Sequence, residues 1–455
     1  MTTRGASSMS SETHIEAHDA ADPRLEKNND PEYRAKGRKA LRAAIGGFFV
    51  DMYDVYLPVI ALAPAIAYFI PADASATEAA TLTALIFAVS LVGRPIGSIV
   101  FGVLGDRVGR RKTTVWVAAG FTVCTGLIAL LPGYADVGWW AAGALVLLRL
   151  IDGIFLGGEY TAANPLAMEY APRDRRGLYG ALLNVGYPAA LGCMTLLTMG
   201  ILEVLPSGDA DAAYSVWGWR IPFAVGFVIS AMVFVHYLRS VPESELWAKT
   251  AGVGNPLAAL LRGRNLRNFA VAFVTSTGAW LILDATIGVF TGHFKKLGAD
   301  PGTVNTTVLI SAVAGVALFP LIGAAGQRFG RRHVIMTIAL FNLVPGPIAF
   351  AFAIGNFTSS AAVIIGASIA IVAGLTVFAM ITAYIMEMFP TEVRSSGYGI
   401  AYSLPSIIPA FYPYYMLWLG KGMNYDLTPL VILVAGGAFL LVGAYISKDL
   451  RHVHL

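Results

Sequence analysis

Long apolar stretches alternate with short polar ones along most of the chain. A membrane-spanning helix needs about 20 mostly apolar residues. Twelve stretches meet that requirement, near residues 42–70, 79–104, 113–132, 138–168, 177–203, 219–239, 267–294, 304–326, 334–355, 360–388, 395–419 and 428–447. The pattern predicts an all-α membrane protein with twelve transmembrane helices.

The two halves of this pattern repeat each other. "MEYAPRDRRGLYG" begins at Met168 and "MEMFPTEVRSSGYG" at Met386, while "GVLGDRVGRR" from Gly102 matches "GAAGQRFGRR" from Gly323 at nearly the same spacing. Two separate matches at one spacing indicate an internal duplication. We therefore expect two homologous six-helix bundles, residues 39–240 and 267–447, joined by a linker at 241–266, as in many secondary transporters.

The chain ends and the loop charges predict an orientation. Residues 1–38 are polar and of mixed charge, which is typical of a disordered tail rather than a signal peptide, and residues 448–455 form a second, short tail. Basic residues gather in alternate loops, among them Arg107, Arg173 and Arg328. The positive-inside rule places these loops and both termini in the cytoplasm, and we expect a monomer in a bacterial inner membrane.

Composition excludes several classes of protein. Of 455 residues, 56% are hydrophobic and 13% charged, with a net charge of +4, and the mean hydropathy is +0.65. A nucleic-acid-binding protein would need a basic face on a soluble surface. The two cysteines, Cys124 and Cys193, lie in apolar runs without metal-ligand spacing. No phosphate-binding loop occurs, so we do not expect ATP to drive this protein. We also expect it to be no enzyme and to bind no cofactor or metal.

Charged residues inside the predicted spans are the candidate functional groups, because a charge at the bilayer centre costs about 2.5–3.5 kcal/mol or more. Asp51 and Asp54 share one face of the first span, and Arg149, Asp152 and Glu159 follow one stripe of the fourth. The others in deep positions are Arg94 and Asp284. Each pair could instead only hold helices together, and Asp284 could be a solvated acid.

Counting ~1.5 Å of rise per residue assigns depths to these groups. The count puts Asp54 level with Arg149, and places Asp51, Arg94 and Asp152 in a second group about one turn nearer the cytoplasm. Three acids near two arginines leave one carboxyl in excess. Crowded carboxylates in a low dielectric hold a proton readily, which favours proton coupling.

Several motifs resemble known transporters. "GVLGDRVGRR" is similar to the loop signature between the second and third helices of the major facilitator superfamily, and Arg149-Leu-Ile-Asp152-Gly153 to its fourth-helix signature, with Asp in place of Gln. "LGGEY", "WGWRIPF" and "VPESELW" resemble the metabolite:proton symporter family. The first-helix sequence Asp51-Met-Tyr-Asp54, followed by "ALAPAI", is closer to aromatic-acid:proton symporters.

This resemblance implies a cytoplasmic latch that holds the outward-open state. Its residues would be Gly102, Asp106, Arg107, Gly109, Arg110 and Arg111. In the second copy Gln327 replaces the acid, so only the first copy is expected to form a full charge network.

Together these observations predict a symporter that imports a small organic acid with protons. Arg149 and Arg94 would bind the substrate carboxylate, with Tyr53 and Tyr160 beside them. The proton-coupling candidates are Asp54, Asp51, Asp152 and Asp284. The alternatives are a symporter of a zwitterion such as proline or betaine, because a zwitterion also carries a carboxylate, and a receptor that senses a metabolite without moving it.

Overall fold

Helices run the length of a two-part bundle in the computed structural model, which describes residues 30–250 and 255–450. In the first half the helices are α3 (Pro31–Tyr56), η1 (Leu57–Leu62), η2 (Ala63–Phe69), α4 (Ala76–Val108), α5 (Arg110–Ala129), α6 (Tyr134–Val137), α7 (Trp140–Glu169), η3 (Arg173–Arg175), α8 (Arg176–Asn184), α9 (Gly186–Val204), η4 (Tyr214–Gly218) and α10 (Arg220–Ser240). Two short helices, α11 (Glu245–Thr250) and α12 (Pro256–Leu260), belong to the linker.

The second half has the same order of long helices. They are α13 (Gly263–Leu283), η5 (Asp284–Gly288), α14 (Val289–Leu297), α15 (Pro301–Phe329), α16 (Arg331–Leu343), α17 (Pro345–Gly355), α18 (Ser360–Thr376), α19 (Phe378–Met386), η6 (Thr391–Val393), α20 (Arg394–Ser403), η7 (Leu404–Ser406), α21 (Ile407–Ala410), α22 (Tyr412–Leu419), η8 (Tyr425–Leu427) and α23 (Thr428–Ile446). The all-helical prediction is confirmed.

Eleven helical segments of the described chain are long and apolar enough to cross a membrane. The remaining predicted span, near 395–419 and the eleventh in chain order, is also helical but is interrupted between α20 and α22. Pro405, Pro409 and Pro413 explain the breaks, because proline removes a backbone donor and clashes with the preceding turn. The arrangement agrees with the predicted twelve-helix fold.

Both ends of the first half show why the helices begin where they do. Helix α3 begins at Pro31 rather than near residue 39, since Asp30 accepts a hydrogen bond from the Glu32 backbone N–H at 2.9 Å. The predicted tail therefore contributes its last residues to a helix, and the remaining residues 1–29 and 451–455 lie outside the described residues. At the opposite end, hydrogen bonds from Ser75 cap α4 and lower the pKa of the Glu78 carboxyl.

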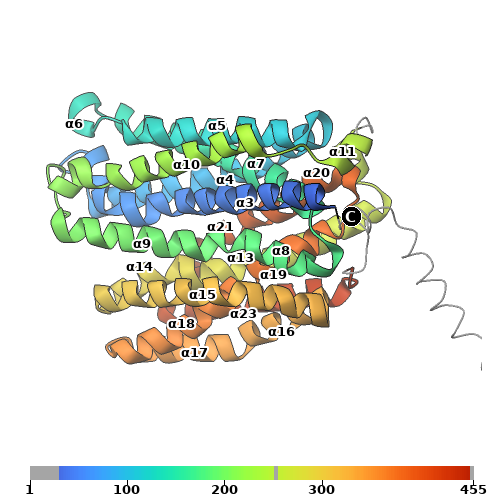
Figure 1. Cartoon of the computed structure of the whole chain (residues 1–455). Coiled ribbons are helices and arrows are strands. Elements are labelled where there is room, and N and C mark those ends of the chain that lie inside the picture. The colour runs from blue at the N-terminus through green and yellow to red at the C-terminus, as the bar shows by residue number, and fades with distance from the viewer. Residues whose placement is uncertain (1–29, 251–254, 451–455) are drawn as a thin grey trace, which may run out of the picture.

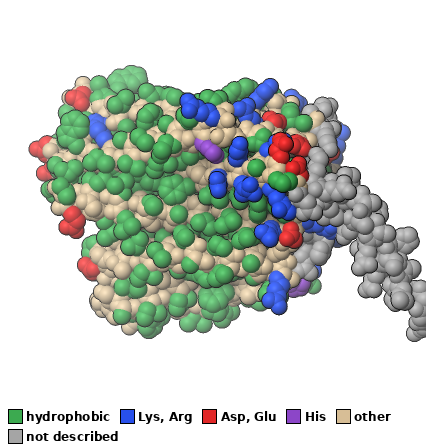
Figure 2. Space-filling view, in the orientation of Figure 1, with side chains coloured by type: hydrophobic (Ala, Val, Ile, Leu, Met, Phe, Trp, Pro, Cys, Tyr) green, Lys and Arg blue, Asp and Glu red, His purple; other side chains and the backbone are tan. Residues whose placement is uncertain are grey.

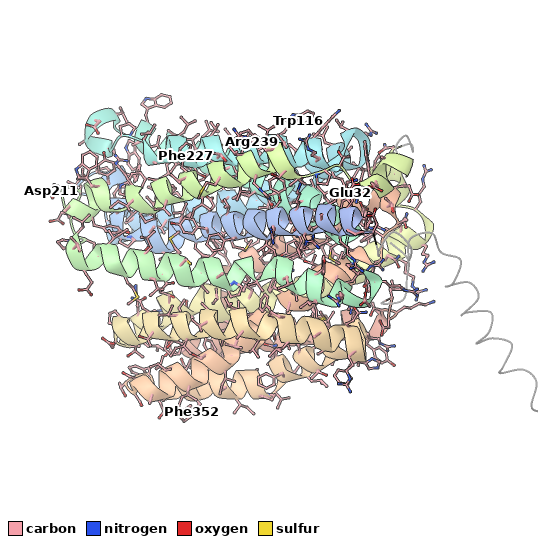
Figure 3. All side chains as sticks on the ribbon, in the orientation of Figure 1. Glu32, Trp116, Asp211, Phe227, Arg239 and Phe352 are labelled. Carbon is pink, nitrogen blue, oxygen red and sulfur yellow. The ribbon has the colours of Figure 1, made fainter. Side chains whose placement is uncertain are left out.

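The surface divides into an apolar belt and two polar ends. The sides of the bundle expose large apolar residues such as Trp116, Phe227 and Phe352, each about half exposed at 50%, 42% and 53% (Figure 3). Lys and Arg gather at the end that also holds the start of α3 and the end of α23 (Figures 1 and 2). We call this end the basic end. The exposed apolar belt is the surface expected to face lipid.

The two halves pack against each other through a few helix pairs. Helix α4 lies against α20, and α15 lies against α8 and α9 (Figure 1). Within the first half, α4 and α7 are close because Gly97 and Gly157 leave room for the partner backbone, where a Cβ would collide. Gly157 lies directly against the backbone of Arg94, so this close approach positions the buried charges described next.

Candidate functional site

The first charged cluster surrounds Arg149 in the interior of the first half. Its Nη1 lies 2.5 Å from an Asp54 oxygen and 3.0 Å from an Asp152 oxygen. The Thr125 hydroxyl lies 3.2 Å from the other Asp54 oxygen, and the guanidinium sits 5.1 Å over the Phe223 ring. All three charged side chains are at most 3% exposed. The expected Asp54–Arg149 pair is therefore present, with two carboxylates on one arginine.

The second cluster is the ion pair between Arg94 of α4 and Asp51 of α3, both at most 2% exposed. Its guanidinium lies 5.7 Å from the centre of the Tyr160 ring. The Tyr160 hydroxyl in turn hydrogen-bonds Ser403 of the second half. The predicted Asp51–Arg94 contact is found, but Asp152 contacts Arg149 instead of this pair. Equal depth does not fix the direction of a side chain around the helix, and Asp152 lies one turn from Arg149 on α7.

Both arginines keep unused donors. Within the described residues, Arg149 Nε and Nη2, Arg94 Nε and one oxygen each of Asp51 and Asp152 are buried without a hydrogen-bond partner. Buried polar groups are normally paired with protein, water or ligand. The clusters thus have the capacity to bind a further acceptor or a proton without breaking every existing contact.

A wall of aromatic rings faces the Arg94 pair from the second half. Tyr160 lies 5.1 Å from Tyr402, and Tyr402 lies 5.3 Å from Trp280, measured between ring centres. Tyr398 stacks on Tyr402 at 5.7 Å, and Trp280 Nε1 donates to the Tyr402 carbonyl at 2.8 Å. Arg94 and Tyr160 of the first half therefore meet aromatic rings of the second half. We call this contact region between the two halves the boundary.

The aromatic wall continues toward the first helix. Phe378 lies 5.4 Å from Trp280 and 5.6 Å from Tyr187, and Tyr187 stacks on Tyr56 at 6.0 Å, again between ring centres. The Tyr187 hydroxyl is buried without a hydrogen-bond partner among the described residues. A polar hydroxyl left unpaired among rings is a further point where a ligand group could bind.

Other predicted site residues are less central. Tyr53 donates to the Pro222 carbonyl at 3.0 Å and packs inside the first half. Glu159 lies near the Tyr237 hydroxyl, also inside the first half. Asp284 begins the turn η5 and is half-buried, with no ion pair found for it among the described residues. The structure thus groups Arg94 and Tyr160 at the boundary, and Arg149 and Tyr53 within one half.

The predicted latch joins the two halves at the basic end. Asp106 accepts hydrogen bonds from the backbone N–H groups of Ser395 and Ser396, at 3.1 and 2.9 Å, at the start of α20. Arg110 donates to the Thr391 carbonyl at 2.8 Å. Gly102 allows α4 to approach Ser396, whose Cα would lie 3.0 Å from an added Cβ. A carboxylate at a helix N-terminus is a favourable electrostatic arrangement.

Not every latch residue takes part in contacts between the halves. Arg107 is exposed. Gly109 ends α4 with a φ of 121°, which favours glycine, and Arg111 donates to the Val241 carbonyl at 2.7 Å. Gly109 and Arg111 therefore contact the start of the linker rather than the second half. Glu243 supports them by accepting the backbone N–H groups of Arg110 and Arg111, each at 3.1 Å.

Glu169 connects the same end more broadly. It forms ion pairs with Arg110 of the first half and with Arg394 of the second, the latter at 2.5 Å, and it accepts from the Ser244 hydroxyl of the linker at 2.5 Å. In the second copy of the motif, Arg331 pairs with Glu387 at 3.0 Å. Burial raises the pKa of the Glu387 carboxyl above its ordinary value, although Arg331 acts in the opposite direction.

Gln327 nevertheless bridges the halves as a neutral group. Its Oε1 accepts the Gly177 backbone N–H at 3.1 Å, and its Nε2 donates to the Arg173 carbonyl at 3.1 Å. Asp106 and Gln327 therefore make equivalent contacts. Each binds the first turn of a helix in the other half, α20 for Asp106 and α8 for Gln327. The sequence already shows Gln327 in place of the acid, but the role of Gln327 in bridging the halves was not predicted.

Sequence reasoning missed several residues of the boundary. Tyr398 and Tyr402 are four residues apart in "SSGYGIAYSLPS", so helical spacing could have placed both rings on one face. Ser395 and Ser396 lie in the repeated motif, where only the charged positions received attention. Glu243 lies within "VPESELW", whose conformation in the linker nothing in the local pattern specifies.

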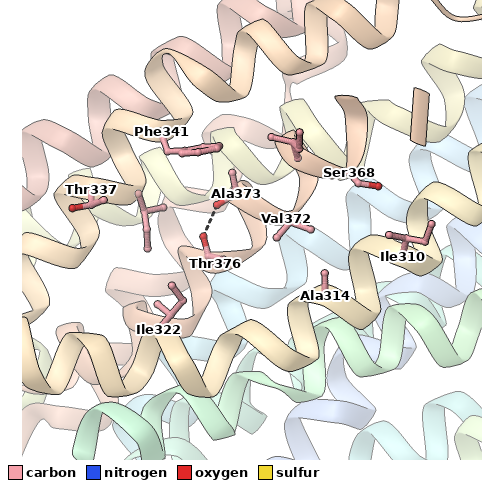
Figure 4. Close-up of a pocket in the computed structure, with 11 residues that line it drawn as sticks. Ile310, Ala314, Ile322, Thr337, Phe341, Ser368, Val372, Ala373 and Thr376 are labelled. Carbon is pink, nitrogen blue, oxygen red and sulfur yellow. Dashed lines mark hydrogen bonds between the residues drawn. The ribbon is translucent and has the colours of Figure 1, made fainter. Parts of the chain in front are cut away.

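An apolar cavity of about 440 Å³ lies elsewhere, among α15, α16 and α18 (Figure 4). Its lining includes Ile310, Phe341 and Val372. The Thr376 hydroxyl, which also lines it, donates a hydrogen bond to the Ala373 carbonyl at 2.7 Å. Its lining residues carry no charge, so it does not suit an anionic solute. Among the described residues, no group of three or more His, Cys, Asp or Glu side chains is placed to hold a metal ion.

Comparison with known proteins matches this architecture. The family model "Sugar (and other) transporter" matches residues 39–255. The Escherichia coli inner membrane metabolite transport protein YhjE is 31% identical over 92% of this chain and 95% of its own length. The E. coli shikimate transporter is 30% identical over 81% and 85%, and the Salmonella typhimurium proline/betaine transporter 28% over 91% and 84%.

The fold agrees with a solved transporter. The structure of the proton:xylose symporter XylE bound to 6-bromo-6-deoxy-D-glucose superposes with a TM-score of 0.74 at 19% identity, covering 92% of this chain and 98% of that one. The matching family model and the relatives, together with this fold, show a membrane transporter of small metabolites rather than an enzyme. The chain belongs to the major facilitator superfamily, within its metabolite:proton symporter family.

Proposed function

We propose that this transporter imports a small organic acid together with protons across a bacterial inner membrane. The observation that carries the proposal is the pairing of three buried acids, Asp51, Asp54 and Asp152, with two buried arginines, Arg94 and Arg149. An unpaired charge inside a membrane protein is costly. One of the three carboxyls is therefore best held as the neutral acid, and releasing that proton requires a change in the cluster.

In this proposal the two clusters have different roles, one in proton exchange and one in substrate binding. Arg149, with Asp54 and Asp152 on one guanidinium nitrogen, lies inside the first half and serves proton exchange. Arg94 lies next to Tyr160 at the boundary and serves the substrate. Its unused Nε lies in a planar guanidinium that suits a carboxylate. A substrate carboxylate arriving there competes with Asp51 for the arginine, which links binding to protonation of that acid.

The proposal also assigns an orientation in the membrane and a state of the transport cycle. Loops rich in Arg and Lys face the cytoplasm in bacterial membrane proteins, and the start of α3 and the end of α23 lie at this end. The contacts of Asp106, Glu169 and Gln327 hold the halves together there. Under this orientation the structure is closed toward the cytoplasm, and transport requires these contacts to open.

A second candidate substrate class is a zwitterion with a quaternary or secondary amine. The faces of Tyr160, Tyr402 and Trp280 beside Arg94 favour it, because aromatic rings attract cations while the arginine binds a carboxylate. The same faces also suit the flat ring of a cyclic acid. Thermal unfolding of purified protein against dicarboxylates, hydroxylated ring acids and betaines separates the classes, since a ligand stabilises the state it binds.

The first prediction concerns coupling through Asp54. Asp54→Asn imitates the protonated acid permanently, so substrate can bind and exchange while no proton is released. In proteoliposomes we expect counterflow to persist and uptake driven by a pH gradient to disappear. Asp211→Asn, an exposed position at the opposite end from Glu32 (Figure 3), is the matched control and keeps both activities. Gradient-driven accumulation by Asp54→Asn would refute the assignment.

A further inference from the structure

A pocket of about 310 Å³ opens at the basic end of the second half, separate from the charged clusters above. It lies where α13 begins, next to the turn after α19 and the segment after α23. Its rim carries three exposed cations, Arg264, Arg267 and Lys448. Within residues 30–250 and 255–450 no ion pair to these cations is found, and the residues lining the pocket include no carboxylate.

The local electrostatics favour an anion. Three like charges around one opening repel each other, and an anion bound between them offsets this repulsion. Arg264 and Arg267 lie one turn apart on the same face of α13, so their charges act at one place. The neighbouring acid Asp449 lies against Gly330, outside the lining of the pocket.

Part of the pocket lining is apolar. Val271, Met388, Ile446 and Leu450 line the pocket together with the polar residues Asn268 and Ser447. Ile446 is 45% exposed and its neighbour Tyr445 is 65% exposed, at the last turn of the membrane-spanning helix α23. The cations therefore lie beside exposed apolar surface at the end of α23.

We propose that this pocket binds the phosphate group of an anionic phospholipid. The phosphate would lie among Arg264, Arg267 and Lys448, and an acyl chain would follow the exposed side of α23 past Ile446 and Tyr445. A soluble anion offers the same phosphate chemistry but would leave the exposed apolar side chains next to the cations, such as Ile446, without a partner. Basic pockets at the cytoplasmic ends of membrane helices have the right charge and depth for lipid headgroups.

The test compares two variants with equal loss of charge. One carries Arg264→Gln, Arg267→Gln and Lys448→Gln. The control carries Arg42→Gln, Arg175→Gln and Arg239→Gln, at exposed positions that do not line the pocket. Delipidated protein is titrated with phosphatidylglycerol, with phosphatidylcholine and with inorganic phosphate, and bound lipid is counted by native mass spectrometry. Thermal unfolding in detergent confirms that each variant is folded.

We expect one retained phosphatidylglycerol on the parent and on the control, and affinity weakened by about tenfold to one hundredfold in the pocket variant. Phosphatidylcholine should bind weakly to all three proteins. Equal retention of phosphatidylglycerol by both variants would overturn the proposal. Displacement of the lipid by inorganic phosphate at similar concentration would assign the pocket to a soluble anion and overturn the lipid as its occupant.

Discussion

At the scale of residues, the two buried arginines have different surroundings although both face carboxylates. Arg149 is enclosed by side chains of its own half, whereas Arg94 touches Tyr160, whose hydroxyl reaches Ser403 of the other half. Only a group at the boundary can contact a solute while the halves move about it. Whether an arginine lies at the boundary or inside one half therefore distinguishes a substrate contact from a proton site better than its depth in the membrane does.

The second prediction compares Arg94→Lys with Arg149→Lys. Lysine keeps the charge but loses the planar fork. Losing one charge-assisted contact costs about 1.5–3 kcal/mol, so Arg94→Lys should raise the KM of uptake about tenfold to one hundredfold. Arg149→Lys should leave substrate affinity near that of the parent and lower gradient-driven uptake. Transport assays with substrate titration, alongside ligand-induced thermal shifts, measure both effects.

An unchanged KM in Arg94→Lys would remove this residue from the substrate site. Exposed Arg262→Lys serves as the control for the substitution itself, and we expect it to behave as the parent does.

At the scale of elements, the hydrophobic pattern predicts the spans well, since the bilayer demands long apolar helices whatever the neighbours. It does not predict the breaks after Ser403, where closely spaced prolines leave several possible turns. Rise per residue also predicts which charges lie at one depth, and it gives the Asp54–Arg149 and Asp51–Arg94 pairs. It fails for Asp152 because rotation around the helix axis, not depth, decides which partner a side chain reaches.

The third prediction concerns the start of α20. Asp106→Asn removes a charge that two backbone N–H groups of α20 now bind, which should destabilise the closed basic end by about 1–2 kcal/mol. We expect uptake to slow several-fold with little change in substrate affinity. A cysteine introduced by Ser395→Cys should react faster with a water-soluble maleimide in this background.

The control comes from the same loop. Arg107→Gln removes an exposed charge that makes no contact between the halves within the described residues. It should change neither the rate of uptake nor the rate of maleimide labelling. Loss of substrate binding in folded Asp106→Asn would contradict its assignment to the latch.

At the scale of the whole molecule, the duplicated sequence folds into two matching halves whose closure is unequal. The first copy closes on α20 through the Asp106 carboxylate, and the second closes on α8 through the neutral Gln327. A charged contact at a helix N-terminus is stronger than a neutral one. The side of the bundle where α4 meets α20 therefore contributes more to keeping the basic end closed, and opening should be limited there.

The last prediction tests whether this boundary must open for transport. A Cβ added to Gly105 would lie 3.4 Å from the Ser395 Cβ, close to the separation that a disulfide needs. Ser395 Oγ has no hydrogen-bond partner among the described residues, so its replacement removes no contact. Gly105→Cys with Ser395→Cys, in a background with Cys124→Ala and Cys193→Ala, should cross-link α4 to α20 on oxidation. Oxidised protein should bind substrate yet lose at least about nine-tenths of its uptake, because alternating access requires the two halves to separate at this end. Reduction should restore transport, and each single cysteine variant should be indifferent to oxidant. Full uptake by completely cross-linked protein would mean that the halves need not separate between α4 and α20. The latch would then be a permanent structural contact rather than a gate.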